Sequence, residues 1–157
     1  MKRNLPEGAE LIATNKKAAF EYKLEDFFEA GMKLMGTEIK AIRNGQVNMN
    51  DCYCYFEEDG LYVRSLFIGE YKHGNVYNHE PRRKRKLLLK KSELRKLEKR
   101  VKERGYSIIP YRVYISARGL AKLEIASAQG KKVHDKRDSL KAKDDKRQME
   151  RIQSGRY

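Results

Sequence analysis

The sequence predicts a mainly β protein: a small closed barrel of the oligonucleotide-binding type with about six strands, one clear helix and a basic tail. Three observations predict this fold class. Short runs of alternating apolar residues are separated by turn signals. A single segment, about residues 92–104, has clear helical spacing. The 157 residues, 39% of them apolar, are enough for one core with a segment outside it.

Six runs have the composition or alternation of half-buried strands. In chain order they are residues 18–24, 32–42, 52–56, 61–67, 106–116 and 120–126. Gly36 interrupts the second run, which predicts a bulge or sharp bend there. Residues 57–60 join the third and fourth runs as a hairpin. Six short strands with a bent second strand favour a closed barrel that binds nucleic acid on its surface.

The expected helix over residues 92–104 begins at Ser92, a residue type that caps helix N-termini. Gly105 follows it as a stop signal. Its apolar positions recur at intervals of three and four, and they are Leu94, Leu97 and Val101. This spacing gives one apolar stripe, which a helix buries against a core.

Positive charge is concentrated in two blocks. The chain has a net charge of +14, yet residues 1–80 carry −3, residues 81–104 carry +10 and residues 130–157 carry +5. Like charges crowded in this way repel one another, so a polyanionic partner is expected, and nucleic acid is the first candidate. Two solubilising surfaces are the simpler alternative. No apolar run approaches the roughly 20 residues that span a bilayer, so we expect a cytoplasmic protein with no membrane contact.

Composition divides the chain into three parts. We expect a loose N-terminus over residues 1–12, an RNA-binding barrel over 13–130 and a basic tail over 131–157. The tail has few large apolar residues, so it is expected to be disordered when free and helical once bound. We expect a monomer.

Enzyme motifs are absent from the sequence. It has no phosphate-binding loop, nucleophile elbow or zinc-protease motif, and Cys52 and Cys54 have no second cysteine pair for a metal. We therefore expect no catalytic residues, no metal and no cofactor. One alternative stays open, a metal-dependent nuclease that uses Glu29 or Glu38.

Basic side chains beside apolar runs are the first candidates for phosphate contacts, because arginine binds phosphate through a bidentate fork. The strongest group is a ridge of consecutive cations, Arg82, Arg83, Lys84 and Arg85. Weaker candidates flank the first two expected strands, and these are Asn15, Lys16, Lys17, Lys40 and Arg43.

Several ordered motifs together resemble the SsrA-binding protein (small protein B, SmpB) family, from about residue 13 to the end. They are Asn15-Lys16-Lys17-Ala18, Phe28-Glu29-Ala30-Gly31, Gly36-Thr37-Glu38-Ile39-Lys40, Ile42-Arg43-x-Gly45, Tyr77-Asn78-His79, Arg85-Lys86-Leu87-Leu88-Leu89, and Gly130-Lys131-Lys132-x-His134-Asp135-Lys136-Arg137. The chain departs from the family pattern at Lys90, Gln129 and Ile152-Gln153.

The resemblance implies a function in trans-translation. Members bind the tRNA-like domain of transfer-messenger RNA (tmRNA) and deliver alanyl-tmRNA, with elongation factor Tu, to stalled ribosomes. The tail then probes the empty mRNA channel beside the ribosomal RNA of the decoding centre. The alternative is a general RNA-binding barrel that acts in ribosome assembly or translation.

The resemblance also implies roles for individual residues. Those that match family residues linked to tmRNA are Glu29, Leu88 and Lys122. Lys131 and Lys132, which lead into the tail, are expected to bind RNA. In the tail, His134 matches a residue that stacks in the decoding centre. The shared run that contacts the ribosome continues through Asp135, Lys136 and Arg137.

Overall fold

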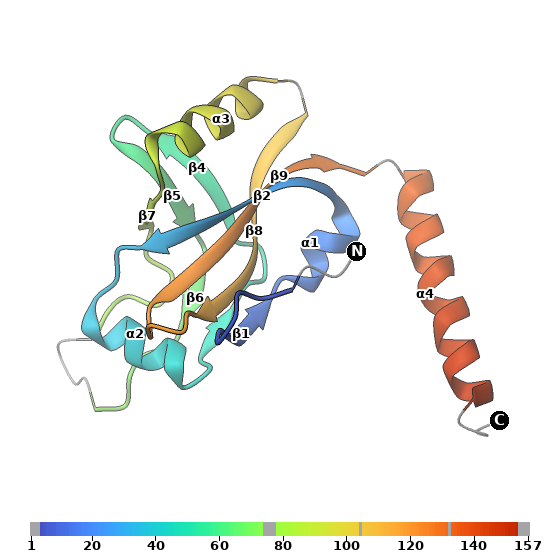
Figure 1. Ribbon diagram of the computed structural model, residues 1–157, viewed down its shortest axis with the longest axis horizontal. Helices are drawn as coiled ribbons and strands as arrows, with labels where there is room; N and C mark the ends of the chain where they lie inside the picture. Colours follow the sequence, from blue (N-terminus) through green and yellow to red (C-terminus); the bar gives the residue numbers. More distant parts are fainter. Residues whose placement is uncertain (1–3, 74–77, 104, 132, 154–157) are drawn as a thin grey trace.

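The computed structural model describes residues 4–73, 78–103, 105–131 and 133–153 (Figure 1). Its strands are β1 (Glu10–Thr14), β2 (Tyr22–Met32), β3 (Val47–Asn48), β4 (Tyr53–Glu57), β5 (Gly60–Arg64), β6 (Phe67–Ile68), β7 (Arg85–Leu88), β8 (Tyr106–Ile115) and β9 (Ala121–Gly130). Its helices are α1 (Lys16–Glu21), α2 (Gly36–Arg43), α3 (Lys91–Lys102) and α4 (Val133–Gln153).

Six of the strands form a closed ring. They are hydrogen-bonded in the order β8-β4-β5-β7-β2-β9, and β9 pairs with β8 to close the barrel. Strand β1 pairs with the C-terminal end of β8, beyond the point where β4 pairs with it, while β3 and β6 form a separate small pair. Inward-facing residues such as Leu61, Val63 and Leu123 have no exposed surface, as the alternation of a barrel strand requires. The mainly β, closed-barrel prediction is confirmed.

The first expected strand is partly wrong. Residues 16–21 form helix α1, and β2 begins only at Tyr22. Asn15 decides the local structure, because its side-chain oxygen accepts a hydrogen bond from the Ala18 N–H at 3.1 Å and caps the helix. Its amide nitrogen donates to the Pro110 carbonyl at 2.9 Å, which ties the cap to β8.

The second expected strand is also wrong beyond Met32. Helix α2 occupies residues 36–43, and Gly36 is its first residue rather than a bulge. Glu38, Ala41 and Ile42 are buried, which is helical spacing. The Glu38 carboxylate accepts the Met35 N–H at 2.9 Å and satisfies a free donor at the start of the helix.

Several later elements lie where the sequence predicts them, but β7 was not predicted, and the expected strand over residues 61–67 divides into β5 and β6. Strands β4 and β5 form the hairpin, and β8 and β9 pair along their lengths. Helix α3 begins after Lys90, two residues before the expected cap at Ser92. Strand β1 begins at Glu10, within the segment expected to be loose.

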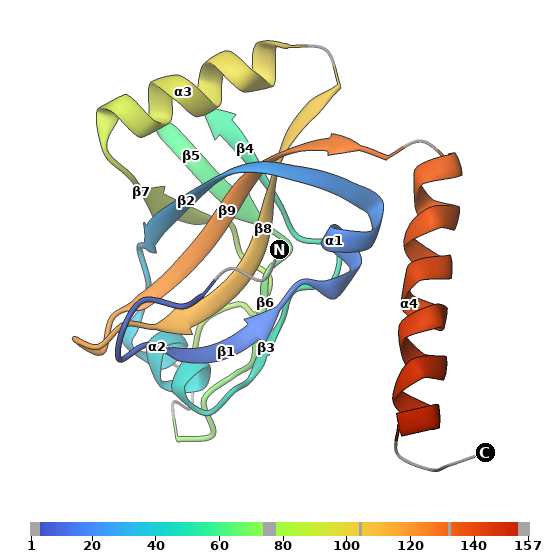
Figure 2. The ribbon, with the colours of Figure 1, turned by 45° about the vertical axis from the view of Figure 1, so that its right-hand side comes forward.

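Two helices cover opposite ends of the barrel, α3 one end and α2 the other (Figures 1 and 2). Helix α4 stands away from the barrel and runs past α1. Every residue from 140 to 150 is exposed, so this part of α4 buries no apolar face. The folding of the tail on binding stays a prediction.

Candidate nucleic-acid interface

Three residues from separate strands meet on the outer surface of the barrel. In the strand registers, Leu88 of β7 lies opposite Gly31 of β2, and Gly31 lies opposite Lys122 of β9. Glu29 precedes Gly31 by two residues and therefore points to the same side. We call Glu29, Leu88 and Lys122 the cross-strand row. Pairing of β2 with both β7 and β9 brings together side chains that are up to 93 positions apart in the chain.

Gly31 lies between Leu88 and Lys122 in the row. A Cβ atom at this position would lie 3.4 Å from the Leu88 Cβ, at the edge of ordinary contact. Leu88 packs beside the β2 backbone at Gly31 and leaves 54% of its surface exposed. An exposed leucine held in a fixed position is suited to contact the apolar face of a base or ribose.

Glu29 is held by two neighbours. Its carboxylate accepts a hydrogen bond from the Tyr114 hydroxyl of β8, and the Lys122 ammonium lies 3.8 Å from its other oxygen. Tyr114 is buried, and this burial together with the adjacent carboxylate raises the pKa of its hydroxyl. The hydroxyl therefore stays protonated as a donor, and Glu29 presents a fixed acceptor beside a cation.

An apolar hollow of about 370 Å³ opens beside the row. Its exposed apolar side chains are Leu88, Met35 and Leu120. Arg43 and Lys122 also line it, and the Arg43 guanidinium donates to the Gly119 carbonyl at 3.3 Å. The hollow thus combines an apolar floor with cations, which is the chemistry that an unstacked nucleotide meets in an RNA-binding protein.

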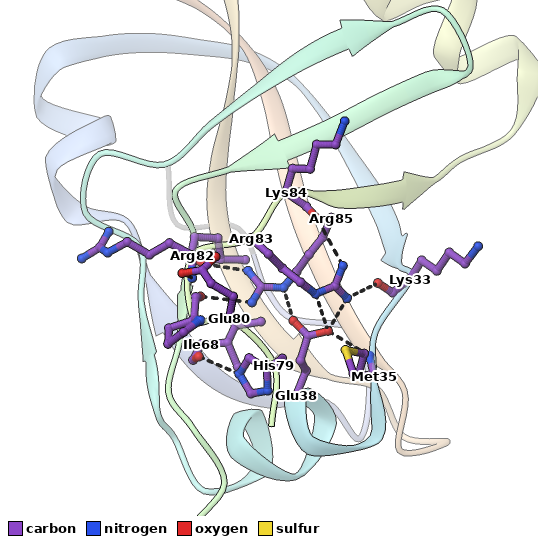
Figure 3. A network of polar contacts seen from close by, with 12 residues as sticks. Lys33, Met35, Glu38, Ile68, His79, Glu80, Arg82, Arg83, Lys84 and Arg85 are labelled. Atoms are coloured by element: carbon purple, nitrogen blue, oxygen red, sulfur yellow. Dashed lines mark hydrogen bonds and ion pairs between the residues drawn. The ribbon is translucent and has the colours of Figure 1, made fainter. Parts of the chain in front are cut away.

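The residues of the basic ridge differ in burial. Arg85 has no exposed surface, because it starts strand β7 as an inward-facing residue. Figure 3 shows its guanidinium beside the Glu38 carboxylate, and it also donates to the Leu66 carbonyl at 2.7 Å and the Pro81 carbonyl at 3.1 Å. The expectation that Arg85 contacts phosphate is contradicted by this position in the core.

The other ridge residues differ in how far they reach solvent. Arg83 is 31% exposed, donates to Glu38 and the Lys33 carbonyl, and so anchors the ridge (Figure 3). Arg82 is exposed, with its guanidinium 5.4 Å from the Phe67 ring centre. Lys84 is exposed and pairs with Glu57 at 2.8 Å. Arg82 and Lys84 therefore carry the accessible charge of the ridge.

Burial pulls the pKa of Glu38 upward, but hydrogen bonds from Arg83, the Met35 N–H and Arg85 outweigh it. The pKa of this carboxyl is therefore below its ordinary value, and the group is a carboxylate at neutral pH. The guanidinium groups of Arg83 and Arg85 already pair with this carboxylate, which argues against Glu38 as a metal ligand in a nuclease.

The candidates near α1 have different positions. Asn15 is only 6% exposed and serves as the helix cap, so it supports the surface and is not itself accessible. Lys16 is exposed, and Lys17 is exposed with its ammonium 3.2 Å from Asp51. The Lys131 ammonium donates to the Ala19 carbonyl at 3.2 Å, so the start of the tail lies against α1.

Lys40 is exposed on α2, with its ammonium 5.3 Å from the Tyr71 ring centre. Lys132 lies outside the described residues. The side chains of the tail motif also lie outside them, and these are His134, Asp135, Lys136 and Arg137.

Sequence reasoning missed Tyr114. Tyr114 sits in the β8 run as an apparent core residue, and only the register with β9 and β2 shows that its hydroxyl reaches Glu29.

Among the described residues, no group of three or more His, Cys, Asp or Glu side chains is placed to hold a metal ion. Cys52 and Cys54 are buried and unpaired, and burial raises the pKa of the Cys52 thiol to about 12. In the same part of the chain, no helix is both long enough and apolar enough to cross a membrane.

A family model described as SmpB protein matches residues 12–155. The chain belongs to the SmpB family. It is 52% identical to an SsrA-binding protein of Phocaeicola vulgatus, over 88% of this chain and 92% of the relative. A Geobacter metallireducens SsrA-binding protein is 46% identical over 90% of this chain and 92% of its own.

A solved SmpB chain, described as "tmRNA-SmpB: a journey to the center of the bacterial ribosome", has a related fold. The TM-score is 0.67 at 38% identity, and the match covers 82% of this chain and 93% of that one. The barrel seen here is therefore the SmpB-family fold, and the cross-strand row lies on its surface.

Proposed function

We propose that this chain is an RNA-binding protein of trans-translation that binds the tRNA-like domain of tmRNA through the cross-strand row. One observation carries the proposal. In a chain of the SmpB family, the three residues that the family motifs link to tmRNA come from β2, β7 and β9 and lie on one surface. Relatives about half identical over most of their length bear the name SsrA-binding protein, which supports the same conclusion.

Each member of the row has a chemical role in this proposal. Lys122 attracts a phosphate, and Leu88 packs against an exposed base or ribose. Glu29, fixed by Tyr114, accepts hydrogen bonds from a ribose 2′-hydroxyl or a base amino group. Recognition then depends on RNA shape and on the 2′-hydroxyl, with little reading of base sequence.

The second stage takes place on the ribosome. The protein body stands in for the missing anticodon arm and is delivered with alanyl-tmRNA and elongation factor Tu. The tail, with His134 and the Asp135-Lys136-Arg137 run, then enters the empty mRNA channel beside ribosomal RNA. In this scheme the chain works in the cytoplasm as a monomer and acts by binding, without catalysis.

Leu88→Ala tests the tmRNA contact directly. Leu88 is 54% exposed, so its truncation should leave the fold intact while affinity for the tRNA-like domain falls about tenfold, the effect of roughly 1.4 kcal/mol. Leu11→Ala is the matched control, because Leu11 is 48% exposed on β1. Binding is measured at near-physiological salt with bulk tRNA as competitor, since salt weakens nonspecific phosphate attraction. Equal affinity for tmRNA and bulk tRNA, or equal loss in both variants, would contradict the proposal.

A further inference from the structure

The outer face of β8 and β9 is covered where it adjoins the cross-strand row. Arg112 and Glu124 lie opposite each other in the strand register and alternate with core residues, so both face outward. Each is nevertheless only 6% exposed, and the Arg112 Nε lies 3.1 Å from the Glu124 carboxylate. An ion pair on the outside of a barrel can be this buried only if another segment lies over it.

Residues 4–9 supply this cover, and we call them the N-terminal strap. The Arg112 guanidinium donates to the Asn4 carbonyl at 3.2 Å. Figure 2 shows the strap passing in front of β8 and β9 before the chain turns into β1. The Ala9 N–H donates to the Pro6 carbonyl at 3.1 Å and closes a turn within the strap. These bonds give the strap a fixed path across the barrel.

Gly8 packs the turn of the strap onto the connection between β8 and β9. Its φ is +76°, in the left-handed region that favours glycine. A Cβ added at Gly8 would lie 2.9 Å from the Ala117 Cβ, which has no flexible end that could move aside. A larger residue would therefore force the strap away from the barrel.

A hollow of about 340 Å³ opens between the strap and the row. This volume lies within the range of about 300–1,000 Å³ that is typical of ligand pockets. Its lining includes Pro6 and Glu7 of the strap, Glu29 and Lys122 of the row, and Arg118 and Leu120 from the β8–β9 connection. Glu7 and Arg118 are exposed, and neither has an ion pair in the part of the chain that the structure describes.

The hollow holds two carboxylates and two cations. Such a balanced set suits a single nucleotide, because the cations attract its phosphate and the carboxylates accept a hydrogen bond from the ribose 2′-hydroxyl beside it. We propose that the strap completes a nucleotide subsite next to the row, in which Glu7 accepts a ribose 2′-hydroxyl of the tRNA-like domain and Arg118 binds the adjoining phosphate. The identity of the RNA rests on the proposed function. The family match begins at residue 12, after the strap.

Glu7→Ala in the full chain tests the acceptor. Removing an acid beside an RNA relieves repulsion, so a purely electrostatic effect would raise affinity. We expect affinity for the tRNA-like domain to fall about fivefold instead, because a hydrogen bond is lost. Glu10→Ala is the matched control, since Glu10 is an exposed acid on β1, and it should not lower affinity. An affinity that is unchanged or raised in Glu7→Ala would overturn the inference.

Arg118→Gln tests the phosphate contact. The log–log slope of affinity against salt should fall by about 1, whereas Glu7→Ala should leave this slope unchanged. Arg64→Gln removes the same charge from an exposed position on β5 and is the control. Equal slopes in Arg118→Gln and Arg64→Gln would contradict the phosphate contact.

Gly8→Ala tests whether the strap must keep its path. The clash with Ala117 should displace the strap and lower affinity as Glu7→Ala does. Gly105→Ala is the control, because Gly105 has a φ of +85° but an added Cβ there would meet nothing closer than 3.9 Å. Thermal unfolding confirms that both variants are folded, and equal affinity in the two would count against the strap.

Leu88→Ala, measured on the same RNA, separates this inference from the proposed function. A loss of affinity in Leu88→Ala without one in Glu7→Ala would overturn the subsite and leave the proposed function standing. If wild type bound bulk tRNA as tightly as tmRNA and Glu7→Ala weakened both, the proposed function would fail and the subsite would stand.

Discussion

At the scale of single residues, Glu38 shows how one buried charge organises a basic surface. Its carboxylate is fully buried and receives both Arg83 and Arg85, which joins α2 to the segment that leads into β7 (Figure 3). A carboxylate taken out of water needs such partners, because desolvation alone would make its charged form costly. The ridge thus has an internal anchor, and Arg82 and Lys84 are left to face solvent.

Glu38→Gln should lower the free energy of unfolding by about 3–5 kcal/mol, because it leaves the buried Arg85 charge without its partner. Urea denaturation measures the effect. Glu57→Gln is the control, since it weakens the exposed pair with Lys84 and should cost far less stability than Glu38→Gln. Similar small costs for both variants would show that the buried network does not stabilise the fold.

The same network predicts a pH dependence. The folded-state pKa of Glu38 is below its ordinary value of 4.5, so the stabilisation is complete above that pH and is lost as the pH falls through the folded-state pKa. The stability gap between wild type and Glu38→Gln should therefore narrow below pH 4.5. Denaturation curves recorded from pH 7 downward measure it, and a gap that widened with acid would contradict the assignment.

At the scale of elements, the length of each helix or strand decided whether the sequence could predict it. The β4–β5 hairpin, α3 and the β8–β9 pair have clear periodicity or turn signals and were predicted in their places. Helices α1 and α2 have six and eight residues, too few to distinguish a helical pattern from alternation. Their structure depends on tertiary partners such as the bond from Asn15 to Pro110, which no local pattern shows.

The candidate site likewise has a part that the sequence predicted and a part that it did not. Charge patterning predicted a basic ridge. The inward direction of Arg85 depends on which face of β7 each residue takes, and a run of consecutive cations does not show which of them points inward. The cross-strand row was named from family motifs. Its assembly on one surface depends on the registers of β2 with β7 and β9, which are long-range contacts that composition does not encode.

Helix α3 offers a prediction of its own. Lys91 is its first residue, where the helix dipole disfavours a cation, so Lys91→Glu should raise the free energy of unfolding by about 0.3–1 kcal/mol. Lys99→Glu makes the same charge change near the other end, where a cation is favourable, and should be the less stable of the two variants. Thermal unfolding of both variants measures the difference, and the reverse order would contradict it.

At the scale of the whole molecule, the structure separates a packed barrel from an exposed helix. The barrel carries the cross-strand row on its outer surface, while α4 extends away from it (Figures 1 and 2). Residues 140–150 are all exposed, so removing the tail should cost the barrel little stability. This division lets one chain hold an RNA with its body while a separate segment contacts another surface.

Deletion of residues 131–157 tests that division most directly, with tmRNA affinity and the tagging of stalled chains measured on the same preparation. We predict that affinity for tmRNA stays within about twofold of the full chain, a change of less than 0.5 kcal/mol, while tagging is abolished. A parallel loss of affinity and tagging, or tagging that survives without the tail, would contradict the account.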